Sequence, residues 1–281
     1  MSEIIVDAHL DLAYNAVVLS RDLTQSVAEI RAAEQGLPSE YHRAVGTCLV
    51  SVSALLAGRV AVAGGSIYVH KAADQHDIGY RTLAEAHQQG VKQLDYYRRL
   101  VDEDARVSLV ASEDALDDVL AAWKTENPRV GIFIVMEGAD PIQEPGELSW
   151  WVERGLRGVG LTWSSGSRYA GGNSAPGGLT DAGRELLDAM AEHNLLLDLS
   201  HMWEEAAYEA LDRYPGPIVA THANPRAFVD SPRMLSDDMI RRIAQRGGVV
   251  GIIPFNVMLK AGFGRDDPRL PVSRVVEAMD H

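Results

Sequence analysis

The most regular feature of the sequence is an alternation of short apolar runs with longer amphipathic stretches. Short runs that are rich in β-branched residues and apolar on both faces are typical of strands in a parallel sheet covered by helices. Residues 107–110 are a candidate for a short strand outside the main alternation. The main pattern predicts strands at residues 4–6, 47–52, 130–136, 159–162, 195–199, 218–221 and 249–253.

Apolar residues at helical spacing fill the gaps between these runs. The spacing is clearest over residues 74–101, 113–123 and 181–193, and Thr180 is a plausible N-cap for the last of these helices. The repeated strand–helix order predicts an α/β protein. Polar residues gather at strand ends all along the chain, which favours a (β/α) TIM-type barrel over an open sheet.

The pattern predicts one strand fewer than the eight that close such a barrel. Residues 271–281 have the spacing of one helical face, and no strand follows them. We therefore expect a single barrel domain over residues 1–281 that is incomplete at its C-terminal end and lacks its eighth strand.

Composition narrows the class of protein. Of the 281 residues, 46% are hydrophobic, which excludes disorder, and the single Cys48 excludes a disulfide scaffold. The formal net charge of −14 argues against nucleic acid or an anionic membrane as partner. The first residues do not have the pattern of a secretory signal, and no uncharged run is long enough to span a membrane. A cytoplasmic location is therefore predicted.

Residues able to bind a metal follow several of the predicted strands. His9 and Asp11 come after residues 4–6, and Glu137, His201 and His222 each follow one further strand. Each of them alone is more often a hydrogen-bonded turn or core residue. Together they would meet at the end of the barrel where active sites form, and an unpaired buried carboxylate needs a cation, a proton or several donors.

Four segments resemble the membrane (renal) dipeptidase family of binuclear zinc peptidases: VDAHLD, the Glu in IVMEGAD, GLTDAGRELLDAMAEHNLLLDLSH and ATHANPRAFVDSPRMLSDDMI. The resemblance implies a barrel of the metal-dependent hydrolase kind with two zinc ions. By motif position, His9 and Asp11 would bind the first zinc, Glu137 would bridge both ions, and His201 and His222 would bind the second. A hydroxide shared by the two ions would then be the nucleophile.

The same resemblance identifies candidates for substrate binding. Arg233 falls on the arginine that the family uses to hold the substrate carboxylate, and Arg226 is a second candidate. For both, the alternative is an ordinary ion pair with a nearby Asp. Asp7 and Asp198 would either orient the imidazoles or cap the strand-end backbone, and the residues alone leave these two roles open.

Two departures from the family concern its catalytic groups. The family has a histidine where this chain has Trp163, and an indole N–H donates a hydrogen bond but carries no charge. The family's aspartate after the last strand has no counterpart after His222. The sequence therefore identifies no certain catalytic residue, and Trp163 is a candidate wall of the substrate pocket.

The leading hypothesis is a zinc-dependent dipeptidase that hydrolyses short peptides or N-acyl amino acids with a free carboxylate. One alternative is another binuclear amidohydrolase, and the other is a non-catalytic fragment or pseudoenzyme that binds metal. The expected partner is a small-molecule or dipeptide substrate, with no nucleic acid and no membrane, and a homo-oligomer is left open.

Overall fold

The computed structural model describes residues 3–75, 77–264 and 266–281. Contacts divide the chain into two compact units. The prediction of one domain over residues 1–281 stays a prediction. The first unit comprises Met1–Tyr68, Gln88–Val135 and Glu153–Arg157, and the second comprises Val69–His87, Met136–Val152 and Gly158–His281.

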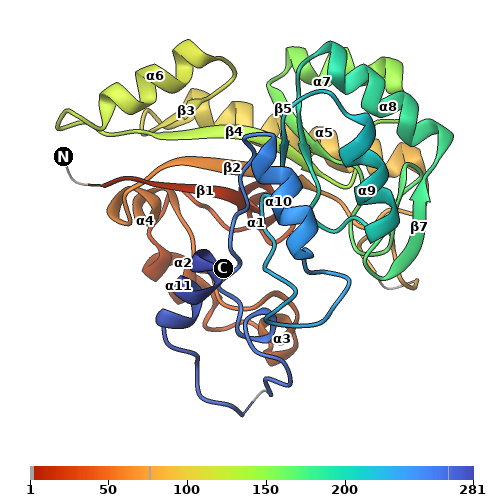
Figure 1. Cartoon of the computed structure of the whole chain (residues 1–281). Coiled ribbons are helices and arrows are strands. Elements are labelled where there is room, and N and C mark those ends of the chain that lie inside the picture. The colour runs from red at the N-terminus through yellow and green to blue at the C-terminus, as the bar shows by residue number, and fades with distance from the viewer. Residues whose placement is uncertain (1–2, 76, 265) are drawn as a thin grey trace. The chain divides into compact units, whose positions relative to one another are not determined.

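The first unit is built on a parallel sheet. Strand β1 (Ile5–Leu10) pairs with β2 (Val60–Tyr68), β2 neighbours β4 (Val130–Glu137), and β3 (Val107–Leu109) pairs with the start of β4. Figure 1 shows these strands with the helices of the same unit. The helices are α1 (Leu12–Val17), α2 (Val27–Glu34), α3 (Ser39–Val45), α4 (Val52–Ala57), most of α5 (Leu83–Glu103), and α6 (Glu113–Ala122).

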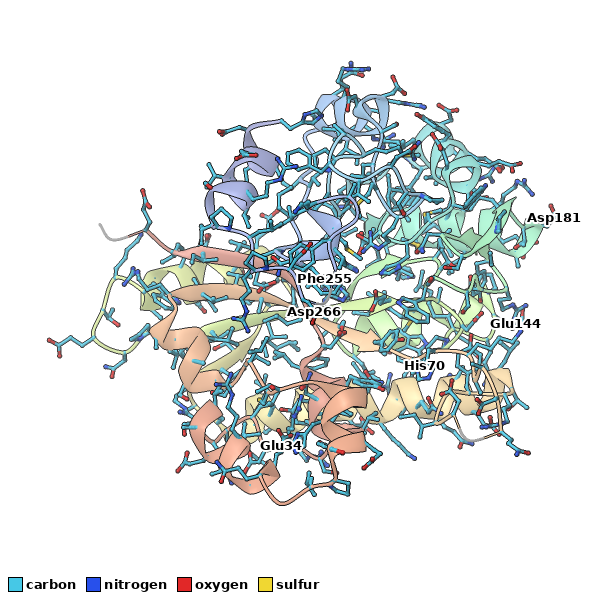
Figure 2. All side chains as sticks on the ribbon, turned by 90° about the horizontal axis from the view of Figure 1, so that it is seen from below. Glu34, His70, Glu144, Asp181, Phe255 and Asp266 are labelled. Atoms are coloured by element: carbon cyan, nitrogen blue, oxygen red, sulfur yellow. The ribbon has the colours of Figure 1, made fainter. Side chains whose placement is uncertain are left out.

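A buried ion pair holds α2 in this unit. The Arg21 Nε atom lies 2.6 Å from Glu34 Oε1, and both side chains are almost fully buried. The same guanidinium donates to Asn15 Oδ1 at 2.7 Å and to the Gly46 carbonyl at 2.8 Å. Glu34 is labelled in Figure 2. The buried charge of Arg21 therefore has a carboxylate and two further acceptors, which offset the cost of removing it from water.

The second unit also contains parallel strands. Strand β5 (Leu156–Gly160) pairs with β8 (Leu196–Asp198), and β8 pairs with β9 (Ile218–Val219). Strands β6 (Ala170–Gly172) and β7 (Ala175–Leu179) form an antiparallel hairpin after β5. The helical elements are η1 (Pro145–Glu147), α7 (Leu148–Glu153), α8 (Asp181–Glu192), α9 (Glu204–Arg213), α10 (Asp237–Gln245), η2 (Asn256–Met258) and α11 (Ser273–Asp280).

Helix α8 shows how local sequence determines an element. Thr180 Oγ1 accepts a hydrogen bond from Gly183 N, which confirms the predicted N-cap. The buried residues of α8 include Leu186, Leu187 and Met190, at the spacing of one helical face. In the described part of the chain, no helix is long and apolar enough to cross a membrane.

Two predicted strands are wrong. Residues 47–50 have no regular structure, and Ser51 caps α4 by accepting from Ala54 N. The strand that pairs with β1 is instead β2. It was not predicted because Gly64 and Gly65 interrupt its apolar pattern. Residues 249–253 form only an isolated bridge, in which Ala220 N donates to Val249 O and Gly251 N donates to Ala220 O. Strand β9 has only two residues, so few of its backbone groups are available to pair with residues 249–253.

Replacement of Gly65 by alanine is expected to destabilise the first unit. A Cβ at this position would lie 2.7 Å from both Ile132 Cγ2 and Tyr97 Cε1. The buried Tyr97 ring cannot move freely because its hydroxyl donates to Ser66 O at 2.7 Å. We expect Gly65→Ala to lower the free energy of unfolding by about 1–3 kcal/mol in urea denaturation. Gly36→Ala is the matched control, since nothing lies within 4 Å of its Cβ position, and an equal loss in both variants would contradict the steric explanation.

Candidate metal and substrate site

Three of the predicted ligands lie together in the second unit. Glu137 is the last residue of β4, whose final two residues belong to this unit, while His201 and His222 follow the ends of β8 and β9. Their distances are short: Glu137 Oε1 lies 3.0 Å from His201 Nε2 and 3.2 Å from His222 Nε2. The two Nε2 atoms are 3.0 Å apart. Parallel neighbouring strands present their carboxyl ends at one edge, which explains the convergence.

The other ring nitrogens show where the imidazole protons lie. His201 Nδ1 is 2.9 Å from Asn173 Oδ1, an acceptor. His222 Nδ1 is 2.9 Å from Thr221 Oγ1, whose own proton is donated to Asp198 Oδ2. Each Nδ1 therefore carries a proton, and each neutral imidazole is left with a lone pair on Nε2.

The cluster thus consists of three electron-pair donors that face one another. Two Nε2 lone pairs and a carboxylate oxygen at such distances repel unless a cation or proton lies among them. Ligands about 2.0–2.2 Å from a tetrahedral zinc ion are themselves roughly 3.3 Å apart. The donor set and its spacing fit zinc, with Glu137, His201 and His222 as the residues that would hold it.

The β6–β7 hairpin positions His201. The backbone of His201 has φ +68°, in the left-handed region that a β-carbon disfavours. Asn173, at the turn of the hairpin, donates from its backbone N to His201 O at 2.9 Å and also accepts from the ring. Burial lowers the pKa of His201 to about 4, against an opposing contribution from Glu137. The imidazole is therefore neutral at pH 7, as a metal ligand must be.

Asp198 supports His222 through Thr221. Its Oδ1 accepts from Ser200 N and Thr221 N, both at 2.9 Å, and its Oδ2 accepts from the Thr221 hydroxyl. Burial alone would raise the pKa of this carboxyl, but His222 and these hydrogen bonds outweigh it, so the pKa lies below its usual value. Asp198 thus has both of the roles that the sequence left open. It caps backbone N–H groups, and it orients the His222 imidazole through the Thr221 hydroxyl.

Arg233 lies directly beside the cluster. Its guanidinium is buried and donates from Nη2 to the His222 carbonyl at 2.7 Å. Its Nε and Nη1 atoms have no hydrogen-bond partner among the described residues. Burial lowers the pKa of Arg233, against opposing contributions from Glu137 and Asp198. Two unpaired donors on a buried cation are suited to an anionic ligand such as a carboxylate.

The remaining candidates of this unit have different surroundings. Arg226 Nη1 lies 3.0 Å from Glu204 Oε2, so its ion-pair partner is a residue that the sequence did not indicate. The Trp163 ring is half-buried, with its centroid 6.0 Å from that of His201 and 6.2 Å from that of His70. Trp163 therefore borders the cluster, as a pocket wall would.

The first unit holds the other two candidate ligands. His9 lies in β1 and Asp11 directly precedes α1, with 3.5 Å between His9 Nε2 and Asp11 Oδ1. The Ser66 hydroxyl donates to Asp11 Oδ1. Asp7 accepts from the backbone N of His9 at 3.2 Å, which is a backbone cap.

Sequence reasoning missed Asn173, Thr221 and Ser66 as supports of these groups. Thr221 is adjacent to His222, and alternation along a strand would place the two side chains apart rather than in contact. Asn173 belongs to a Gly-Gly-Asn-Ser turn that indicates a hairpin but gives no sign of contact with a histidine.

Comparison with known proteins identifies the family. The model of the membrane dipeptidase family, "Membrane dipeptidase (Peptidase family M19)", matches residues 1–281. The chain belongs to this family of metallopeptidases, and the recognition made from the sequence is confirmed.

Two curated relatives and one solved structure illustrate the similarity. "Uncharacterized protein in PQQ-III 3'region" of Acinetobacter calcoaceticus is 29% identical over 200 residues, which are 68% of this chain and 62% of that protein. "Uncharacterized protein in pqqA 5'region" of Klebsiella pneumoniae is 34% identical over 155 residues, 52% of this chain and 57% of that protein. The chain thus spans less than two thirds of the length of these relatives.

The solved structure is a metallo peptidase from Rhodobacter sphaeroides liganded with a phosphinate mimic of the dipeptide L-Ala-D-Ala. It is 20% identical, covers 100% of this chain and 82% of that one, and has a TM-score of 0.79. This likeness shows the fold, and the predicted α/β, TIM-type barrel class is confirmed.

Removal of the Thr221 hydroxyl is expected to weaken metal binding. Thr221→Val would separate His222 from the charge of Asp198, and loss of such a support typically costs about 10–100-fold in metal affinity. Thr221→Ser keeps the hydroxyl and should bind zinc nearly as well as the unchanged protein. Competition with a chelating dye measures both affinities, and equal affinity for zinc in the Val and Ser variants would contradict the role assigned to the hydroxyl.

Proposed function

We propose that the protein is a zinc-dependent dipeptidase that hydrolyses short peptides or N-acyl amino acids carrying a free carboxylate. The observation that carries this proposal is the position of Arg233, a buried cation with two unpaired donors, next to Glu137, His201 and His222. The Rhodobacter sphaeroides structure with its phosphinate mimic of a dipeptide supports the same substrate class.

The shape of the guanidinium favours a carboxylate as the group that is bound. Nε and Nη1 of Arg233 have no partner in the part of the chain that the structure describes, and two N–H groups on one planar cation match the two oxygens of a carboxylate. The third direction is taken by the His222 carbonyl, which fixes the orientation of the fork. Arg233 would therefore hold the free carboxylate and orient the peptide bond toward the donor cluster.

The other residues of the second unit would prepare the cluster for zinc. Glu137, His201 and His222 would hold the ion, which supplies activation of water and polarisation of a carbonyl when it is bound. Thr221 and Asn173 keep the proton of each imidazole on Nδ1, so that Nε2 stays available. Trp163 would exclude water on the side of His201.

The number of zinc ions is part of the proposal. His9 and Asp11 of the first unit are proposed as ligands of a further zinc ion because their motif resembles that of the family. Glu137 would then serve both ions. A cytoplasmic location likewise stays a prediction from the sequence.

One observation favours a second candidate function. Trp163 stands where the family has a histidine, and loss of a hydrogen-bond donor to the transition state can cost roughly 10²–10³ in rate. A protein that binds zinc and a carboxylate but hydrolyses nothing would fit this feature. Hydrolysis assays on protein with measured zinc content separate the two functions. A different binuclear amidohydrolase, acting on a cyclic amide or ester, is disfavoured because its substrate would have no carboxylate for Arg233 to bind.

The first test concerns metal content. Protein purified without chelator is expected to retain at least one zinc ion per chain, because three protein ligands and water suffice for a zinc site. His222→Ala should remove most of the zinc held by the second unit, whereas His193→Ala, at the end of α8, should remove none. Elemental analysis measures the content, and protein without zinc in the unchanged form would refute the proposal.

The second test concerns the substrate carboxylate. Arg233→Ala should raise KM for a dipeptide roughly 10–100-fold, since it removes charge-assisted hydrogen bonds to a buried group. Arg233→Lys should recover only part of this loss because lysine lacks the planar fork. Arg241→Ala and Arg241→Lys are the matched controls, since Arg241 is an exposed arginine of the same unit that pairs with Asp238. Steady-state kinetics that are unchanged in both Arg233 variants would place the carboxylate elsewhere.

A further inference from the structure

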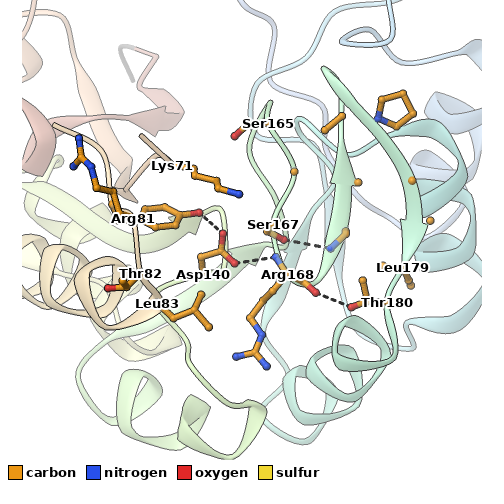
Figure 3. A pocket seen from close by; sticks show the side chains of 18 residues that line it. Lys71, Arg81, Thr82, Leu83, Asp140, Ser165, Ser167, Arg168, Leu179 and Thr180 are labelled. Carbon is orange, nitrogen blue, oxygen red and sulfur yellow. Dashed lines mark hydrogen bonds between the residues drawn. The ribbon is translucent and has the colours of Figure 1, made fainter. Parts of the chain in front are cut away.

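A cavity lies in the second unit and is lined by the β6–β7 hairpin, the same hairpin that contacts His201. It encloses about 670 Å³, a size typical of small-ligand pockets. Figure 3 shows its walls: a segment around Lys71 and Arg81, the segment with Asp140, and the β6–β7 hairpin. The hairpin wall includes several glycines and so presents mainly backbone to the cavity.

The cavity carries positive charge although the chain as a whole has a net charge of −14. Lys71, Arg81 and Arg168 line it, and Asp140 is the acidic residue among the lining side chains. Asp140 is already satisfied, because Oδ2 accepts from the Tyr80 hydroxyl and Oδ1 accepts from Arg168 N at 2.9 Å. An anion in this cavity would therefore meet more positive than negative charge.

Lys71 is the cation available to a ligand. Arg81 donates to the carbonyls of Asp74, Asp77 and Gly79. Arg168 donates to the carbonyl of Gln143. The exposed Lys71 has no ion-pair or hydrogen-bond partner for its ammonium group among the described residues, and Figure 3 shows this group projecting into the cavity.

The cavity and the donor cluster share the hairpin. Asn173 at its turn holds His201, and Trp203 N, two residues beyond His201, donates to Gly171 O at 2.9 Å. Gly172 packs so closely that a Cβ there would lie 2.1 Å from Trp163 O. The Trp163 ring lies near the rings of both His201 and His70, and Lys71 follows His70 in the chain.

We propose that this cavity is the subsite for an acidic side chain of the substrate residue on the amino side of the scissile bond, with Lys71 as the residue that selects it. The inference rests on the proposed dipeptidase function. Arg233 would hold the free carboxylate on the His222 side of the cluster. The residue across the scissile bond then extends past Trp163 and His201, toward the cavity that Lys71 lines. The preferred substrates are thus peptides that begin with Glu or Asp.

Substrate selection tests this assignment on the zinc-loaded protein. The unchanged protein should hydrolyse Glu-Ala with a kcat/KM about tenfold above that of the isosteric Gln-Ala, as expected for a charge-assisted hydrogen bond. Lys71→Gln should bring this ratio close to one, and Lys71→Arg should keep most of it. Lys260→Gln is the control, since Lys260 is an exposed lysine of the same unit that lies 3.9 Å from Asp267. Equal kcat/KM for the two substrates in the unchanged protein would overturn the proposal.

A binding measurement separates this proposal from the dipeptidase function. Isothermal titration calorimetry of zinc-free protein with glutarate should give a Kd that Lys71→Gln weakens about tenfold, while Lys260→Gln leaves it unchanged. If no dipeptide is hydrolysed, the proposed function fails, and the glutarate titration still decides whether Lys71 binds a carboxylate. An unchanged Kd for glutarate in Lys71→Gln would overturn the assignment of this cavity as the subsite.

Discussion

The organisation of the second unit depends on the mutual approach of three electron-pair donors. Glu137 Oε1 and the Nε2 atoms of His201 and His222 lie within 3.2 Å of one another. Because both imidazole protons are on Nδ1, none of the three brings a proton to the centre. Such a cluster is unfavourable without a cation, so the surrounding fold must hold the donors in place.

The two imidazoles are held by chemically different supports. The His201 ring donates to the neutral amide of Asn173, whereas the His222 ring donates to a hydroxyl that in turn donates to the ionised Asp198. A carboxylate behind a histidine raises its basicity as a ligand, and an amide does so less. His222 is therefore expected to be the stronger donor, and His201 the one tied most closely to the hairpin.

Positive charge is placed selectively in this acidic chain. Arg233 is buried next to Glu137 and Asp198, and Lys71 projects into the cavity that the β6–β7 hairpin lines. An anionic molecule would be repelled by much of a surface with net negative charge and attracted to these two positions. A peptide with a free carboxylate at one end and an acidic side chain at the other would match both cations.

The sequence by itself determined the positions of the candidate metal-binding side chains relative to the strands, the cap of α8, and the family. These features depend on local order: apolar periodicity, a Thr before a helix, and motifs of a few consecutive residues. It failed for β2, where a Gly-Gly pair interrupts the apolar pattern, and for residues 249–253, where a partner of only two residues limits pairing. Only the tertiary structure decided which side chains support the candidate ligands, because Asn173 is 28 residues from His201, and Asp198 is 23 from Thr221. The contact of Arg226 with Glu204, and the two donors of Arg233 that have no partner among the described residues, were decided in the same way, since a charged side chain pairs with whatever the fold brings near it.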